Sequence, residues 1–157
     1  MRKLVLALAV AGLLAVAPTV MAAVKARLAG TFDVTGTIKE NDFGIPPGTK
    51  TPDVWTFTGC RRAGCKTVKV DRQGGATANA HYKSTLHKVR RGVYKGTEGP
   101  YPYDCPGRDD AMFTAAHTVK ITKAKNGKAT VVGGSSKVKI TNCGFTYVNY
   151  SLSGKLR

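Results

Sequence analysis

The feature that most limits the fold of this chain is a strict alternation of apolar and polar residues in several short stretches. It is clearest between Phe113 and Lys123, where one side carries Phe113, Ala115, His117, Val119 and Ile121. A period of two residues is typical of a β-strand with one buried face. After residue 22, no stretch has apolar residues three and four positions apart behind a helix cap. We therefore expect an all-β protein.

The same alternation recurs along the chain between loops that are rich in glycine and proline. The expected strands are 31–38, 54–58, 66–72, 81–89, 92–98, 113–123, 128–142 with a break or bulge at Gly133-Gly134-Ser135, and 145–156. About eight short strands at this spacing are typical of a barrel or a sandwich. Consecutive hairpins favour a small antiparallel up-and-down barrel, because closing the sheet removes its exposed edges. A two-sheet β-sandwich is the alternative, since the same strands serve both architectures.

The first 22 residues have the pattern of a secretory signal peptide. A cationic start at Arg2 and Lys3 precedes an apolar run from Leu4 to Ala17, and small or aliphatic residues lead up to Ala22. The apolar run is shorter than the roughly 20 residues that a membrane-spanning helix needs. We expect cleavage after Ala22, a secreted product, and one β-barrel-like domain formed by residues 23–157.

Four cysteines remain after this cleavage: Cys60, Cys65, Cys105 and Cys143. An even number of cysteines in an exported chain predicts two disulfides, for which three pairings are possible. The four residues between Cys60 and Cys65 form a turn-length spacer, which favours the pairs Cys60–Cys65 and Cys105–Cys143. No histidine sits beside either pair, so we expect no structural zinc site and no other metal.

The charge balance is the main functional signal. Lysine and arginine number 25 against 9 aspartate and glutamate residues, a formal net charge of +16. Such an excess favours contact with polyanions, although single surface lysines also block edge pairing. We expect a basic face that binds an anionic polymer, a lipid head group or an acidic protein surface, with no cofactor. The residues assigned to this face are Arg61, Arg62, Lys69, Lys88, Arg90, Arg91, Lys120, Lys137 and Lys139.

Two other classes of function stay open. A small secreted hydrolase acting on an anionic substrate would use one of the histidines His81, His87 and His117, paired with Glu40, Glu98 or Asp33 as acid and base. No nucleophile motif, metal-spaced cluster or glycine-rich phosphate loop accompanies these residues, so the sequence favours a binding domain over an enzyme. A protein–protein interaction or inhibitor module would instead present the loop from Asn41 to Pro52.

The aromatic and cysteine pattern resembles a loosely defined group of exported actinobacterial β domains. The motifs are Trp55-x-Phe57 before Cys60, Gly64-Cys65, Gly92-Val93-Tyr94-Lys95-Gly96, a proline-rich loop with Cys105, and Cys143 before the last strand. This resemblance implies the fold, export and disulfide pairing, and it brings no catalytic residue because the group has no established activity. Gly30-x-Phe32 and the closing Arg157 also resemble the lipocalin-like barrels, where tryptophan more often occupies the position of Phe32.

Overall fold

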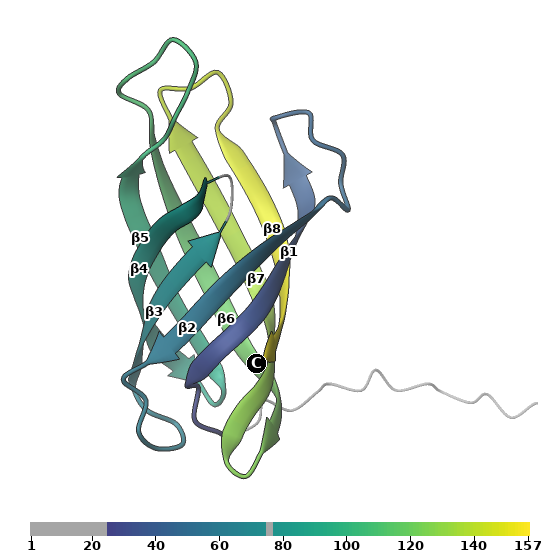
Figure 1. Cartoon of the computed structure of the whole chain (residues 1–157), viewed down its shortest axis with the longest axis vertical. Coiled ribbons are helices and arrows are strands. Elements are labelled where there is room, and N and C mark those ends of the chain that lie inside the picture. Colours follow the sequence, from purple (N-terminus) through teal and green to yellow (C-terminus); the bar gives the residue numbers. More distant parts are fainter. Residues whose placement is uncertain (1–24, 75–76) are drawn as a thin grey trace, which may run out of the picture.

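The protein is an eight-stranded antiparallel barrel. The computed structural model describes residues 25–74 and 77–157, so the expected signal peptide lies outside the described residues. The strands are β1 (Gly30–Asn41), β2 (Lys50–Thr58), β3 (Thr67–Gly74), β4 (Thr77–Arg90), β5 (Val93–Pro102), β6 (Met112–Lys125), β7 (Lys128–Thr141) and β8 (Tyr147–Leu156) (Figure 1). Within this part of the chain, no helix is long and apolar enough to cross a membrane.

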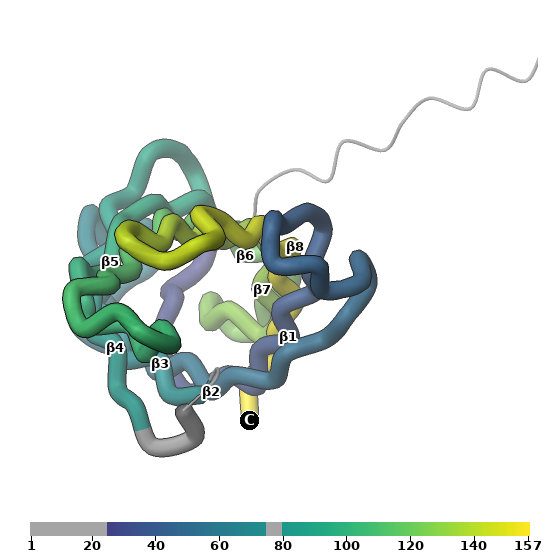
Figure 2. The backbone as a smooth tube through the Cα atoms, turned by 90° about the horizontal axis from the view of Figure 1, so that it is seen from above, coloured from purple at the N-terminus to yellow at the C-terminus, as the bar shows by residue number. Residues whose placement is uncertain are grey.

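Each strand pairs with the next one along the chain, and β1 closes the sheet by pairing with β8. Phe32 of β1 therefore lies in register between Trp55 of β2 and Leu156 of β8. Figure 2 shows the resulting ring from above. The expected up-and-down barrel is confirmed, and the sandwich alternative does not apply because no pair of strands is left as an open edge.

Side chains that point inward fill the barrel as two apolar clusters. The larger cluster contains the aromatic residues Phe32, Trp55 and Phe57, which are all at most 2% exposed. The smaller cluster surrounds Phe113 and Ile140 at the other end. Alternation along β6 places Phe113, Ala115, His117, Val119 and Ile121 in the interior, as its sequence pattern predicts. The period of two residues thus correctly identified the buried face.

Both expected disulfides are present. Cys60–Cys65 closes the loop between β2 and β3, with its Cα atoms 5.6 Å apart. Cys105–Cys143 joins the β5–β6 loop to the β7–β8 loop across a sequence separation of 38 residues. Each bridge therefore fixes loops at one end of the barrel, and the two bridges lie at opposite ends.

The structure corrects the predicted boundary of β2, which we placed after the proline-rich loop. Pro52 lies inside this strand and pairs with Thr35 of β1. The pairing between β2 and β3 begins only at Asp53, so Pro52 has a neighbouring strand on one side alone. A proline is tolerated at such an edge because it interrupts no ladder on the open side.

The glycine pair in β7 was also expected to break or bulge the strand, yet β7 is one continuous strand from Lys128 to Thr141. Gly134 has a positive φ of 154°, and a Cβ there would collide with the backbone carbonyl of Thr118 in β6. Glycine is needed at this position because the two backbones approach too closely for any side chain. It permits tight pairing of β6 and β7.

Candidate functional site

The two ends of the barrel carry different connections (Figure 1). One end carries the β2–β3 loop, the turns at 91–92 and 126–127, the segment before β1, and the C-terminus. The other end carries the β1–β2, β5–β6 and β7–β8 loops. This arrangement follows from the up-and-down order, because every second connection of such a barrel returns to the same end.

Charge is divided unequally between these ends. At the first end, the segments 25–29, 59–66, 88–95, 123–128 and 155–157 contain no aspartate or glutamate. We call this the basic end. Its fourteen cationic residues are Lys25, Arg27, Arg61, Arg62, Lys66, Lys88, Arg90, Arg91, Lys95, Lys123, Lys125, Lys128, Lys155 and Arg157. All nine acidic residues of the chain lie outside these segments, so the cations there have few local counter-charges.

The segment before β1 closes the basic end. Ala26 and Leu28 are at most 1% exposed and belong to the larger apolar cluster. Arg27 donates its backbone N–H to Gly127 and accepts from the N–H of Ala129, so the segment is hydrogen-bonded to the β6–β7 turn. The alternation directs Lys25, which is exposed, away from the core. The burial of Ala26 and Leu28 therefore fixes the position of Lys25 at the basic end.

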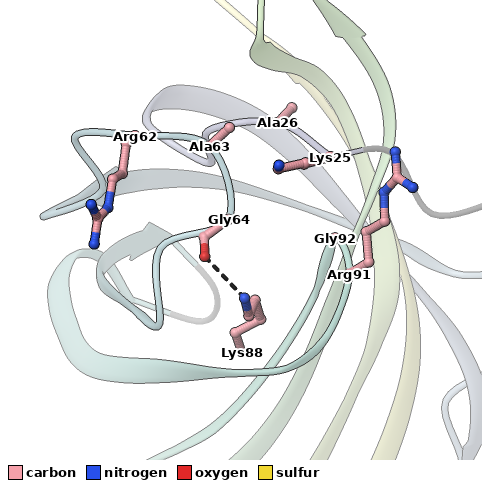
Figure 3. A pocket seen from close by; sticks show the side chains of 8 residues that line it. All are labelled: Lys25, Ala26, Arg62, Ala63, Gly64, Lys88, Arg91 and Gly92. Carbon is pink, nitrogen blue, oxygen red and sulfur yellow. Dashed lines mark hydrogen bonds between the residues drawn. The ribbon is translucent and has the colours of Figure 1, made fainter.

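A pocket of about 390 Å³ lies at this end, between the β2–β3 loop, the β4–β5 turn and the segment before β1 (Figure 3). Its lining residues are four cations and four small residues: Lys25, Arg62, Lys88, Arg91, Ala26, Ala63, Gly64 and Gly92. Among the described residues, none of these four cations forms an ion pair with a carboxylate. The pocket is thus suited to an anion from outside.

Hydrogen bonds fix the walls of this pocket. Lys88 donates from Nζ to the carbonyl oxygen of Gly64 at 3.0 Å, which Figure 3 marks, and from its backbone N–H to Lys66 at 2.7 Å. The backbone N–H of Gly64 in turn donates to Ala26. Together with the Cys60–Cys65 disulfide, these contacts hold the loop that carries Arg62. The cations are therefore presented on a fixed backbone.

The structure brings together five of the nine cations that we assigned to the basic face: Arg61, Arg62, Lys88, Arg90 and Arg91, all at the basic end. Lys69 lies on β3 and is exposed on the barrel wall. Lys120, Lys137 and Lys139 lie on the wall formed by β6 and β7, with Lys120 half-buried. The nine cations of the expected basic face are thus divided between the basic end and separate positions on the barrel wall.

Sequence reasoning missed Lys25, which lines the pocket, and the cations around the β6–β7 turn. The order of the expected strands nevertheless contains a signal for them. In an up-and-down barrel of eight strands, both chain termini and the second, fourth and sixth connections share one end. Applied to the expected strands, this rule groups these cations at the same end of the barrel.

A second cluster of charges lies inside the barrel, between the two apolar clusters. Arg72 of β3 contacts Glu98 of β5 at 2.6 Å and Asp53 of β2 at 3.4 Å. His117 Nε2 of β6 lies 3.2 Å from the other carboxylate oxygen of Glu98. Trp55 donates from Nε1 to Asp53. These buried charges do not suit an apolar ligand, because it would have to displace paired groups.

The two buried carboxylates respond differently to this environment. Burial raises the pKa of Asp53, and the charge of Arg72 only partly opposes this effect. Burial also acts to raise the pKa of Glu98, but contacts from His117 and Arg72 outweigh it and hold that pKa below its usual value. The environment of Glu98 therefore favours its ionised form, whereas the environment of Asp53 favours its protonated form.

The three histidines that we considered for catalysis have different surroundings. His117 is buried against Glu98 and Trp55, with its Nδ1 lacking a hydrogen-bond partner among the described residues. His81 is exposed, and its Nδ1 lies 2.9 Å from Asp71, which is not one of the three carboxylates expected to pair with a histidine. His87 is exposed on β4. No group of three metal-ligating side chains occurs in the part of the chain that the structure describes.

The loop from Asn41 to Pro52, which we considered for a protein–protein module, is held in place by hydrogen bonds of its own polar side chains. The side-chain amide of Asn41 accepts from the backbone N–H of Phe43 and donates to Ile45. Asp42 accepts hydrogen bonds from Thr146 in the β7–β8 loop and from Tyr147, the first residue of β8. The bond from the backbone of Tyr147 is the main cause of the lowered pKa of Asp42. These contacts fix the loop that carries exposed Ile45.

Comparison of the chain with protein-family models, curated proteins and solved structures finds no match in any of the three. The function of the protein is therefore inferred from the geometry and charge described above.

Proposed function

We propose that this protein is a secreted binding domain whose basic end engages an anionic polymer or surface. The observation that carries the proposal is the pocket lined by Lys25, Arg62, Lys88 and Arg91, at an end whose loops and terminal segments contain no aspartate or glutamate. Cations concentrated without counter-charges produce a positive potential that attracts polyanions and speeds their association. Because hydrogen bonds and a disulfide already hold the walls of the pocket, binding requires little further ordering of the backbone.

Two observations support a location outside the cytoplasm. The two disulfides are compatible with an extracytoplasmic protein, since such bonds persist in oxidising compartments. The sequence of residues 1–22 matches a signal peptide. In that location the protein would encounter acidic polymers and anionic lipid head groups, and both present the phosphate, sulfate or carboxylate groups that lysine and arginine bind.

Two variants with the same change in charge test the proposal. Lys25→Ser, Arg62→Ser and Arg91→Ser together remove three cations from the pocket. Lys69→Ser, Lys137→Ser and Lys139→Ser together remove three cations from the barrel wall. Affinity for heparin, measured by titration calorimetry at low salt, should fall about tenfold or more for the pocket variant and less than about threefold for the wall variant.

Equal losses in both variants would mean that net charge alone drives the interaction, which would contradict a site at the basic end. Failure of the unmodified protein to bind heparin, nucleic acid and anionic vesicles at low salt would overturn the proposal entirely. The melting temperatures of both variants serve as the control for folding, because exposed positions of this kind contribute little to stability.

A second candidate function is hydrolysis of an anionic substrate, and one contact favours it. Asp71 lies 2.9 Å from Nδ1 of His81, whose side chain is half exposed. Lys83, two residues further along β4, is also exposed. A histidine held in this way can accept a proton at Nε2. Phosphodiesterase activity that disappears in His81→Asn but persists in His87→Asn would establish this function.

A further inference from the structure

The cations of the basic end are distributed in a ring, which we call the rim, and they do not line a linear groove. They come from five chain segments distributed around one end of the closed barrel, with the strands running away from it (Figure 1). A linear polyanion follows a groove and meets cations in a row along its backbone. A rim around the end of a barrel can be met by an extended anionic surface, which reaches several segments at once.

An exposed apolar side chain lies within this rim. Val89 is 54% exposed and is the most exposed large apolar residue among those that the structure describes. The pairing of β4 with β5 shifts register between Lys88 and Arg90, so Val89 occupies a bulge. A bulge redirects a side chain away from the regular face of a sheet. Here the bulge exposes the side chain of Val89 between the cations Lys88 and Arg90, at the end of β4.

The combination of cations with an apolar tip is characteristic of proteins that bind at membrane interfaces. Lysine and arginine near an anionic leaflet are attracted by its surface potential, and an apolar side chain gains further free energy by entering the head-group region. A single valine contributes only a fraction of the total. Charge would therefore drive docking, and Val89 would distinguish a bilayer from a soluble polyanion.

The chain also enters the barrel at this end. Lys25, the first described residue, lines the pocket of the rim. The apolar run of the sequence ends at Ala17, eight residues earlier, and eight residues span at most about 28 Å when fully extended. Until cleavage after Ala22 removes that apolar run, its insertion into a membrane would hold the basic end within this distance of the lipid surface.

We propose that the basic end docks end-on against an anionic lipid bilayer, with Val89 entering the head-group region and the loops of the opposite end directed away. This inference rests on the proposed function and specifies its partner. It commits to a lipid surface, and a soluble polyanion becomes an outcome of the test.

The first test separates lipid from polymer. The probes are vesicles of phosphatidylcholine with about one third phosphatidylglycerol, vesicles of phosphatidylcholine alone, and heparin. We expect Val89→Ser to weaken partitioning into the anionic vesicles by about threefold to tenfold while heparin affinity stays unchanged. Ile45→Ser, at the opposite end, is the matched control and should change neither.

The second test measures orientation. Val89→Trp and Ile45→Trp each add a tryptophan to the constant background of buried Trp55. Brominated lipids in the anionic vesicles should quench the fluorescence at position 89 and not at position 45. Quenching at position 45 alone, or at neither position when the protein is bound, would overturn end-on docking.

The outcomes distinguish this inference from the proposed function. Binding to heparin without binding to anionic vesicles would refute lipid docking and leave polyanion binding intact. Equal losses of vesicle and heparin affinity in Val89→Ser would also refute the inference, since the valine would then act through the fold. Absence of binding to either probe would refute both proposals.

Discussion

Arg72 and Glu98 are joined inside the barrel, with 2.6 Å between Nη2 of the guanidinium and Oε1 of the carboxylate. They come from β3 and β5, two strands that are separated by β4. The side chain of Glu98 is fully buried, and that of Arg72 is 12% exposed. Because Arg72 also contacts Asp53, one cation balances two carboxylates from different strands. The pairing therefore ties three strands together at mid-height of the barrel.

We expect Arg72→Met to lower the free energy of unfolding by about 3–5 kcal/mol, because it leaves two buried carboxylates without their cation. The double variant Arg72→Met, Glu98→Gln should lose less than the single variant, since one of the orphaned charges is removed with it. Urea denaturation measures both. Arg157→Ser is the comparison: its ion pair with Asp33 is more than half exposed on both sides, so solvent screens it and its loss should change the free energy of unfolding far less than Arg72→Met does. Similar losses in all three variants would contradict this view of the interior.

The stability of the protein should decrease in acid because of Glu98. A carboxyl whose pKa is lower in the folded state contributes stability above its unfolded pKa of about 4.5, and this is lost as the pH falls through the folded value. Glu98→Gln should therefore flatten the loss of stability below about pH 4.5. The contribution of Asp53 to stability changes in the opposite direction, because its raised pKa makes the folded state bind a proton more readily than the unfolded state as the pH falls.

Asp53→Asn is thus the informative partner variant, because it removes a group that offsets the loss caused by Glu98. Its stability should fall more steeply with decreasing pH than that of the unmodified protein. Thermal denaturation at a series of pH values measures both variants. The assignment of the two groups would be wrong if the two substitutions changed the pH profile in the same direction.

The sequence predicted the barrel, its strands and both disulfides, because these depend on local patterns. The period of two residues places Trp55 and Phe57 inside without any knowledge of their neighbours. Glu98 is different. Its strand segment, 92–98, has little apolar content, so the sequence pattern gives no sign of burial, yet Glu98 is 1% exposed. Its burial depends on Arg72 and His117, which come from strands that only the tertiary fold brings near.

The same limit applies to the candidate site. Arg62, Lys88 and Arg91 were recognised as cations in turns, but their grouping around one pocket depends on the closure of the barrel. Lys25 was only a residue near the expected cleavage site. Its place in the pocket follows from the burial of Ala26 and Leu28, which no pattern in so short a segment predicts.

The two disulfides should contribute unequally to stability. In the chain-entropy model, the loop of 38 residues closed by Cys105–Cys143 is worth about 4 kcal/mol, and the short loop closed by Cys60–Cys65 about 2 kcal/mol. Paired serine variants of each bridge, compared by denaturant unfolding, test this order.

The Cys60→Ser, Cys65→Ser variant should also weaken heparin binding, because that bridge holds the loop that carries Arg62. Loss of heparin affinity in the Cys105→Ser, Cys143→Ser variant alone would contradict the assignment of the site to the basic end.

The dependence of binding on salt should identify how many cations of the pocket act together. Each phosphate that a lysine or arginine neutralises contributes about 0.7 to 0.9 to the slope of log affinity against log salt concentration for nucleic acid. Removing Lys25, Arg62 and Arg91 should therefore reduce that slope by about two to three, if each contacts a phosphate. The wall variant that lacks Lys69, Lys137 and Lys139 carries the same net charge and should keep the slope of the unmodified protein. Titration of both variants with a short single-stranded DNA at several salt concentrations gives the two slopes. Parallel lines for the pocket variant and the unmodified protein would show that these three cations are not in contact with the nucleic acid, even if the affinity itself had fallen.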